Sequence, residues 1–265
     1  DWQAMRQLVA DEIGRLKKSA PIKIAKAERE ELSAFLAWLY DDHFTFLGYR
    51  EVSYSGTGKK ARMTVVQDSG LGVLREPEVE VFEGLRNLGG QTPEVQAFVR
   101  APELLVITKA TRRSTVHRSV PMDVIVLKTF DDKGKVVGMK LIAGLFTSVA
   151  YSETPTKIPL LRRKVAAVVE NSGYDAGSHD GKALIHVLED YPRDELFQSD
   201  LDMLTHVAHG IVRLQERQRI ALFLRRDPYE RYVSAMVYLP RERFNTGLRK
   251  AYDGILSRAF NGSVQ

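Results

Sequence analysis

A compact group of basic and hydroxyl side chains lies between two β-rich stretches in the middle of the sequence. It contains Arg112, Arg113 and His117, with Ser114 and Thr115 between them. Guanidinium groups bind carboxylates and phosphates through paired hydrogen bonds, so this group is a candidate anion site. The alternative is a basic edge strand, whose charges discourage pairing with another chain. The sequence leaves both interpretations open.

Two histidines have a spacing that could bind a metal ion. His206 and His209 lie three residues apart on a predicted helix, with Asp202 on the same polar side. Side chains at this spacing can chelate a metal. The apolar stripe of the helix lies elsewhere, however, so a solvated helix surface explains the same residues. We therefore expect no metal site here.

The remaining motifs do not complete a catalytic or nucleotide-binding site. Residues 56–61 have the glycine spacing of a dinucleotide-binding turn, but a β-rich stretch follows them where that turn requires a helix. The sequence has no G-x-S-x-G nucleophile motif, and the paired acids Asp131 and Asp132 fit a turn. We therefore predict that this chain holds no catalytic residue, no metal and no cofactor.

Composition places the chain among ordinary globular proteins. It has 265 residues, of which 44% are hydrophobic and 28% are charged. Its lack of cysteine excludes disulfides and thiolate zinc sites and is compatible with a reducing compartment. No apolar run is long enough to span a membrane, and no secretory leader opens the sequence. We expect a cytoplasmic protein that does not enter a membrane.

The chain is basic, with a net charge of +5, but its charges are mixed. Thirty-nine lysines and arginines are interleaved with 34 aspartates and glutamates. This pattern favours a solvated surface of mixed charge. A nucleic-acid or anion-binding module is the alternative, and it would require basic residues gathered on one face.

The periodicity of apolar residues predicts an α+β fold. Expected helices cover 1–19, 26–40, 159–170, 181–189, 199–217 and 241–260, and expected strands cover 44–54, 62–66, 104–108, 115–120, 123–130, 136–150, 220–225 and 232–239. A mainly antiparallel sheet with flanking helices therefore comes first, a helical connector second and a β-β-α unit last. Two strands and one helix cannot bury both faces of a sheet, so we expect this last unit to be incomplete.

Several stretches of the sequence resemble one protein family. They are FLAWL (35–39), DHFTFLGYR (42–50), ITKA (107–110), STVHR (114–118), GLFTS (144–148), and residues 158–197, 214–219 and 223–227. Together they are similar to the N-terminal regulatory region of the large bacterial NAD-specific glutamate dehydrogenases. The similarity extends from about residue 28 to the end of the chain.

This resemblance implies a division into modules. It implies a helix and linker over 1–20, a PAS-like domain over 26–152, a helical connector over 153–218 and the start of an ACT-like, ferredoxin-like module over 219–265. It also implies a homo-oligomeric parent enzyme that converts L-glutamate and NAD to 2-oxoglutarate, ammonia and NADH. NAD would bind to a catalytic domain further along the parent chain.

The resemblance also implies regulation by an amino-acid effector. Arg225, Arg226 and Asp227 are the candidate contacts, because an amino acid presents a carboxylate to arginine and an ammonium group to aspartate. Surface charges near a subunit interface are the alternative interpretation of these residues.

Overall fold

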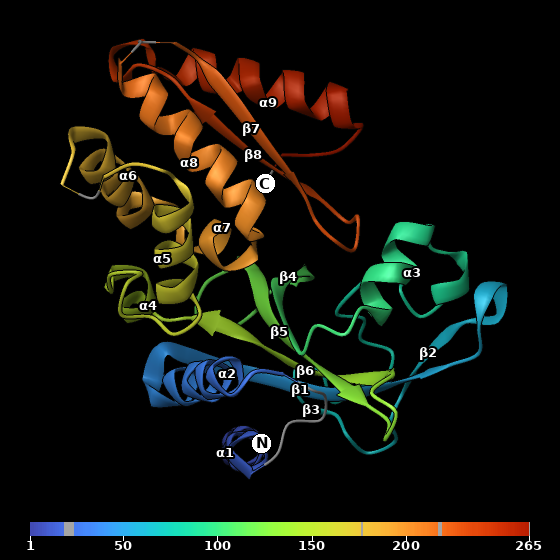
Figure 1. Ribbon diagram of the computed structural model, residues 1–265. Coiled ribbons are helices and arrows are strands. Elements are labelled where there is room, and N and C mark those ends of the chain that lie inside the picture. The colour runs from blue at the N-terminus through green and yellow to red at the C-terminus, as the bar shows by residue number, and fades with distance from the viewer. Residues whose placement is uncertain (19–23, 176, 217–218, 265) are drawn as a thin grey trace.

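An antiparallel sheet is the framework of the longer, N-terminal part of the chain (Figure 1). The computed structural model describes residues 1–18, 24–175, 177–216 and 219–264. The strands are β1 (Phe44–Ser55), β2 (Arg62–Val65), β3 (Leu71–Gly72), β4 (Leu105–Arg113), β5 (Pro121–Phe130) and β6 (Val136–Phe146). Their order is β2-β1-β6-β5-β4, and β3 pairs with β1. β4 therefore forms one edge of the sheet.

The helices gather around this sheet and around a second, smaller one. They are α1 (Trp2–Lys18), α2 (Lys26–Trp38), α3 (Pro93–Arg100), α4 (Ser148–Ser152), α5 (Leu161–Asn171), α6 (His179–Asp190), α7 (Arg193–Gln198), α8 (Leu201–Glu216) and α9 (Thr246–Phe260). The second sheet pairs β7 (Ala221–Arg226) with β8 (Val233–Tyr238). The predicted α+β class with a terminal β-β-α unit is confirmed. The predicted linker break at Ser19, Ala20 and Pro21 lies outside the described residues.

The large sheet separates two hydrophobic cores, as the alternation along β5 shows. Ile125 and Leu127 face a core shared with α1, α2 and α5 to α8, whereas Val124 and Val126 face a core shared with α3. All four side chains are buried. A strand covered on both faces is apolar at successive positions. For this reason the apolar run within residues 123–130 predicts a strand.

One predicted strand is absent, and another ends earlier than expected. Residues 115–120 do not form a strand, because the Ser114 hydroxyl donates to the Val116 carbonyl and His117 adopts a left-handed φ of 63°. These features close the connection between β4 and β5 into a bend. β6 ends at Phe146, and residues 148–150, expected as the end of a strand, belong to the short helix α4.

Several helix boundaries also differ from the prediction. α6 begins at His179, before the expected start at residue 181, because Ser178 caps it: the Gly181 amide donates to its Oγ at 3.0 Å. α8 begins at Leu201, after the expected start at residue 199, and the Met203 amide donates to Oδ1 of Asp200 at 2.7 Å, which caps the helix. The predicted start of the last helix at Arg241 is wrong. A short turn follows Pro240, and α9 begins after Asn245.

Candidate functional site

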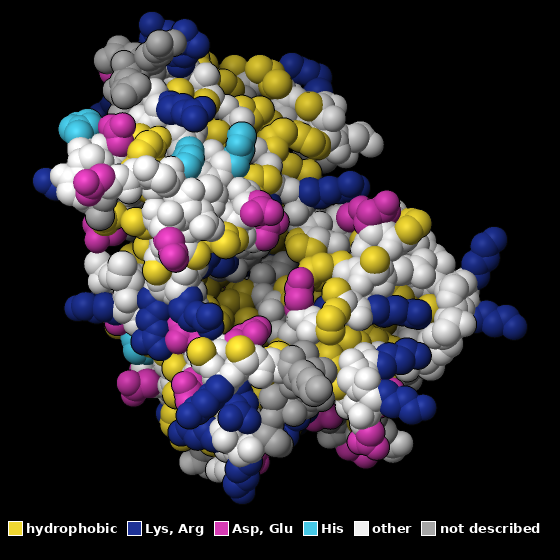
Figure 2. Space-filling model, in the orientation of Figure 1, with side chains coloured by type: hydrophobic (Ala, Val, Ile, Leu, Met, Phe, Trp, Pro, Cys, Tyr) yellow, Lys and Arg dark blue, Asp and Glu magenta, His cyan; other side chains and the backbone are white. Residues whose placement is uncertain are grey.

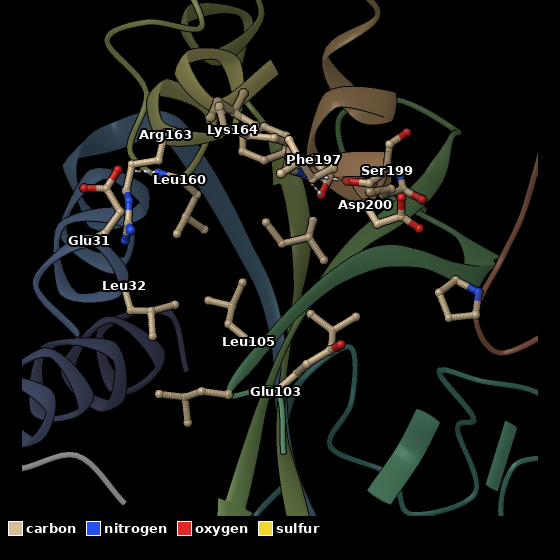
Figure 3. Close-up of a pocket in the computed structure, with 18 of the residues that line it drawn as sticks. Glu31, Leu32, Glu103, Leu105, Leu160, Arg163, Lys164, Phe197, Ser199 and Asp200 are labelled. Carbon is tan, nitrogen blue, oxygen red and sulfur yellow. Dashed lines mark hydrogen bonds between the residues drawn. The ribbon is translucent and has the colours of Figure 1, made fainter. Parts of the chain in front are cut away.

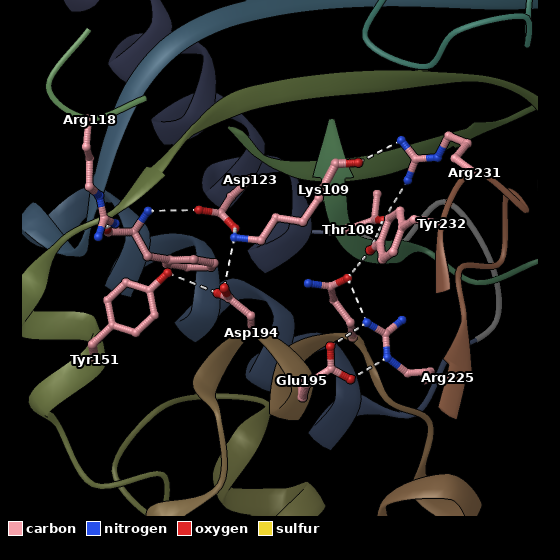
Figure 4. A network of polar contacts seen from close by, with 12 residues as sticks. Thr108, Lys109, Arg118, Asp123, Tyr151, Asp194, Glu195, Arg225, Arg231 and Tyr232 are labelled. Carbon is pink, nitrogen blue, oxygen red and sulfur yellow. Dashed lines mark hydrogen bonds and ion pairs between the residues drawn. The ribbon is translucent and has the colours of Figure 1, made fainter. Parts of the chain in front are cut away.

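The turn between β7 and β8 docks on the exposed edge of the large sheet. Asp227 is buried there and accepts a hydrogen bond from the Thr108 hydroxyl of β4 at 3.0 Å. Arg231 donates to the same carboxylate at 2.8 Å. It also donates to the Lys109 carbonyl at 2.6 Å, as Figure 4 shows. The two sheets are therefore joined by the Thr108–Asp227 bond and by the bond from Arg231 to the Lys109 backbone, while the Arg231–Asp227 ion pair lies within the turn.

Tyr229, in the same turn, inserts into the second hydrophobic core. Its side chain is 3% exposed and stacks on Phe82, with ring centroids 4.7 Å apart. Phe98 of α3 meets the ring edge-on at 5.1 Å. Burial raises the pKa of the Tyr229 hydroxyl well above its ordinary value. The turn is thus fixed to the sheet by an apolar anchor as well as by charges.

A second charged pair joins β7 to α7, which belongs to the helical segment formed by α4 to α8. The Arg225 guanidinium donates to Glu195 of α7 through Nε at 2.7 Å and through Nη2 at 2.8 Å. Gln198 accepts from Arg225 at 3.2 Å and from the Tyr232 hydroxyl. Both members of the pair are buried, so removing either one would leave an uncompensated buried charge.

A third group of charges joins the helical segment to the large sheet. Lys109 Nζ lies 2.6 Å from Asp123 of β5 and 3.0 Å from Asp194 of α7. The Tyr151 hydroxyl of α4 donates to Asp194 at 3.0 Å. Burial raises the pKa of Asp123 to about 6, and the nearby Asp194 charge adds to this effect while Lys109 opposes it. Burial alone would lower the pKa of Lys109, but the two carboxylates raise it overall.

The structure places the predicted anion-binding residues on two different connections. Arg112 is exposed at the end of β4, Arg113 donates to the Ser119 carbonyl, and His117 is exposed in the bend that follows. Arg226 is exposed beside the docked turn and pairs with Glu230 at 3.2 Å. Effector contact by these residues and by Arg225 and Asp227 stays a prediction.

The two histidines considered for metal binding pack on aromatic rings. His209 lies 5.3 Å from Tyr174, and His206 meets Phe223 edge-on at 6.5 Å, measured between ring centroids. Across the described ranges, no group of three or more histidine, aspartate and glutamate side chains is arranged to hold a metal ion.

A large cavity opens between the sheet edge and the helices. Its volume is about 900 Å³, and Figure 2 shows a hollow with a hydrophobic floor at the centre of this face. Leu32 of α2, Leu105 of β4 and Phe197 of α7 contribute to its walls (Figure 3). This volume is in the range of pockets that hold small molecules.

Lys164 occupies the inner wall of this cavity. Its Nζ donates to the carbonyls of Leu196 and Ser199 at 2.7 Å each and to that of Phe197 at 3.3 Å. Burial lowers the pKa of Lys164 to about 8, and the charge of Arg225 adds to this effect. These bonds close the end of α7 and set the position of the connection to α8.

Sequence reasoning missed most of the charged residues that join the modules. Asp123 and Lys109 lie in mostly apolar stretches of β5 and β4, and Glu195 lies in α7, which has too few residues for a clear period. A charge within an apolar strand is itself a signal, because buried charges need a partner. The identity of that partner depends on the tertiary fold.

The fold and its contacts define a class of protein: an α+β chain in which a helical segment ties a large sheet to a C-terminal ββα unit. Within the part of the chain that the structure describes, no helix is long and apolar enough to cross a membrane.

Comparison with known proteins finds glutamate dehydrogenases. Residues 158–217 match the family "Glutamate dehydrogenase, helical motif 1", and residues 221–265 match "Glutamate dehydrogenase, ACT2 domain". The chain is 37% identical over 249 residues to the NAD-specific glutamate dehydrogenase of Halomonas elongata, and this match covers 94% of the chain and 15% of the relative. The chain is therefore similar, over nearly its whole length, to a part of the NAD-specific glutamate dehydrogenases.

Two further relatives carry the same name. The protein of Pseudomonas aeruginosa is 37% identical over 263 residues, covering 99% of this chain and 16% of the relative. The protein of Mycobacterium tuberculosis is 28% identical over 268 residues, and this match covers 99% of the chain and 15% of the relative. The chain thus spans about 15% of the length of the relatives that it matches.

Proposed function

We propose that this chain is a non-catalytic regulatory and oligomerisation segment of an NAD-dependent glutamate dehydrogenase. The parent enzyme would oxidise L-glutamate with NAD and water to 2-oxoglutarate, ammonia and NADH in the cytoplasm. The names of the relatives, and their much greater length, support this proposal. NAD would be held by a catalytic domain elsewhere in the parent.

The proposal assigns a role to each part of the chain. Residues 26–152 would form a PAS-like module behind the helix and linker of residues 1–20. Residues 153–218 would be the helical connector, and residues 219–265 the incomplete start of an ACT-like module. The matched family segments, 158–217 and 221–265, support the last two assignments. The partners would be the catalytic domain, further copies of the same chain and an amino-acid effector.

The observation that carries the proposal is the docked turn between β7 and β8. Tyr229 anchors it in the core of the large sheet, Asp227 binds Thr108, and Arg225 binds Glu195 of the helical segment. A displacement of the ββα unit must therefore move the sheet edge and α7 with it. Rigid contacts of this kind can couple a ligand site to a distant domain.

The division of labour can be tested by assaying NADH formation from L-glutamate. We expect the parent enzyme to form NADH and the 265-residue chain to form none. Turnover by the chain alone would contradict the proposal. Circular dichroism of the same sample is the control, since an unfolded chain would also be inactive.

A further inference from the structure

The edge strand β4 begins with residues whose main-chain groups face away from the sheet. Leu104, just before the strand, accepts a hydrogen bond from the Lys128 amide of β5 at 2.9 Å. In an antiparallel pair, successive residues turn their main-chain groups alternately toward the partner strand and away from it. Leu105 and Ile107 therefore turn their amide and carbonyl groups to the open side of β4. Among the described residues, these groups bond to no segment on that side.

The second half of the same edge is covered. The Lys109 carbonyl accepts from Arg231 of the docked turn, and the Thr111 amide donates to the Val81 carbonyl at 3.1 Å. Sheet edges are usually covered in this way or protected by charged side chains, because an open edge pairs with other chains. Residues 105–107 are all uncharged and apolar, so in the described structure the first half of the edge lacks both kinds of protection.

The cavity runs along this open half of β4. Four successive residues, 104–107, line it. Because successive side chains of a strand point to opposite faces of the sheet, a cavity lined by all four lies at the edge of the strand and not over one face. Leu32 of α2 and Phe98 of α3 pack against the cores on the two faces of the sheet, and both line the cavity. Figure 3 shows Leu32 and Leu105 at this recess.

The walls of the recess admit one extended segment but no second folded copy of the chain. Residues of α2, α5 and α7 form the side of the cavity that faces the open edge. The opening is a hollow in this face of the molecule, as Figure 2 shows, and not a protruding edge. Two folded copies can pair edge to edge only where both edges protrude. A single peptide strand needs only the width of one strand beside β4.

The charges of the lining indicate the charge of the segment. Glu28 and Glu103 are exposed, and among the described residues neither forms an ion pair or a side-chain hydrogen bond. Arg225 and Arg226 of the lining are each paired with a carboxylate, and Arg163 lies across the cavity from Glu103 (Figure 3). The exposed charge next to the start of the open half is therefore acidic. A basic side chain complements it.

We propose that the open half of β4 binds an extended, basic peptide segment of another protein as an additional strand. The main chain of the segment pairs with Leu105 and Ile107, its apolar side chains fill the recess, and a lysine or arginine at its end meets Glu103. Recognition of this kind takes its affinity from main-chain hydrogen bonds and its specificity from side-chain pockets. It does not depend on the proposed function, since it requires neither glutamate oxidation nor the catalytic domain.

Fluorescence anisotropy of a labelled peptide tests the site in the full-length protein. The peptide alternates valine and threonine and ends in two lysines. One comparison peptide has the same sequence with every amide N-methylated, and a second ends in two glutamates. We expect saturable binding of the lysine peptide and at least about tenfold weaker binding of both others, which lose the main-chain donors or the charge. Absence of saturable binding, or equal binding of either comparison peptide, overturns the proposal.

A pair of substitutions at Leu105 tests main-chain pairing. Leu105→Pro removes an amide that faces the open side, and proline is tolerated at such a position because the bonds to β5 remain. It should weaken binding of the lysine peptide at least about tenfold. Leu105→Ala shortens the same side chain but keeps the amide, so binding should change less than about threefold. Equal affinities of the two variants contradict strand pairing.

A charge reversal at Glu103 locates the end of the peptide. Glu103→Lys should weaken binding of the lysine peptide about tenfold and strengthen binding of the glutamate peptide. An unfolded variant could not gain affinity, so the second result also shows that the fold is intact. Asp132→Lys makes the same change of charge at an exposed residue outside the cavity lining, and it should leave both affinities unchanged. Equal effects of the two reversals overturn the proposed site, whatever the outcome of the NADH assay.

Discussion

Lys128 illustrates how burial and hydrogen bonding act together on one charged side chain. It is 1% exposed in β5, and its Nζ donates to the carbonyls of Phe98 at 2.6 Å and Ala101 at 2.8 Å. These carbonyls end α3, where a cation is favourable. Burial nevertheless lowers the pKa of Lys128 to about 8 from 10.5. The side chain thus closes a helix at the cost of a buried charge.

The pKa of Lys128 gives a prediction for stability against pH. The folded chain binds fewer protons than the unfolded chain between pH 8 and 10.5, so the Lys128 contribution to stability rises with pH in this window. Lys128→Met should remove that rise and, by leaving two carbonyls unbound, cost about 1–3 kcal/mol. Urea unfolding at several pH values checks this. If the difference in the free energy of unfolding between wild type and variant does not change with pH, the prediction is contradicted.

Truncation of Arg225 and truncation of its neighbour Arg226 should reduce the stability of the fold by very different amounts. Arg225→Ala leaves Glu195 buried without its partner, and breaking such a pair costs about 3–5 kcal/mol. Arg226 is an exposed residue paired with Glu230, so Arg226→Ala should cost about 0–1 kcal/mol. Chemical denaturation of the two variants measures both. Similar values would show that the Arg225–Glu195 pair does not join β7 to α7 as described.

At the scale of elements, the helices and strands in which apolar residues recur regularly could be predicted from the sequence. The stripe of Leu32, Phe35, Leu36 and Leu39 predicted α2, and all four side chains are buried. Three helices, α3, α4 and α7, were missed because each has too few residues for a repeated stripe. The expected strand over 115–120 was wrong because local hydrogen bonds of Ser114 replaced sheet pairing.

The candidate site was less predictable than the fold. Arg225 and Asp227 were singled out from the sequence, but their partners Glu195 and Thr108 lie 30 and 119 residues away along the chain. No local pattern encodes such distances. The cavity likewise arises from α2, β4, α5 and α7 together, so it became visible only in the folded structure.

The packing of the docked turn predicts that the Tyr229 ring contributes strongly to the stability of the contact between this turn and the large sheet. Tyr229→Ala removes a ring that packs on Phe82 and Phe98, and loss of a buried aromatic side chain costs about 3–5 kcal/mol. Tyr40→Ala is the control, because Tyr40 is 36% exposed. Arg6 lies over its ring, 4.0 Å from the centroid, so we expect a smaller cost of about 0.5–1 kcal/mol. Thermal denaturation compares the two, and equal melting temperatures would argue against the anchor.

At the scale of the whole molecule, exposed apolar side chains gather in the C-terminal ββα unit. They include Ile220, Leu222, Leu224, Phe244 and Ile255, and α9 has no buried residue. Exposed apolar clusters usually mark surfaces that contact other protein. This distribution supports the proposal that residues 219–265 begin a module completed by further contacts, while the large sheet has its own cores.

The coupling of this chain to a catalytic domain is the central claim. Its most direct test is NADH formation from L-glutamate by the full-length parent carrying Tyr229→Ala, compared with Tyr40→Ala. Tyr229 lies in the docked turn, so we predict a changed turnover number in Tyr229→Ala at an unchanged oligomeric state, and wild-type turnover in Tyr40→Ala. Hydrogen exchange would establish that the turn is released in Tyr229→Ala. If both variants then have the turnover number of the wild type, the account is contradicted.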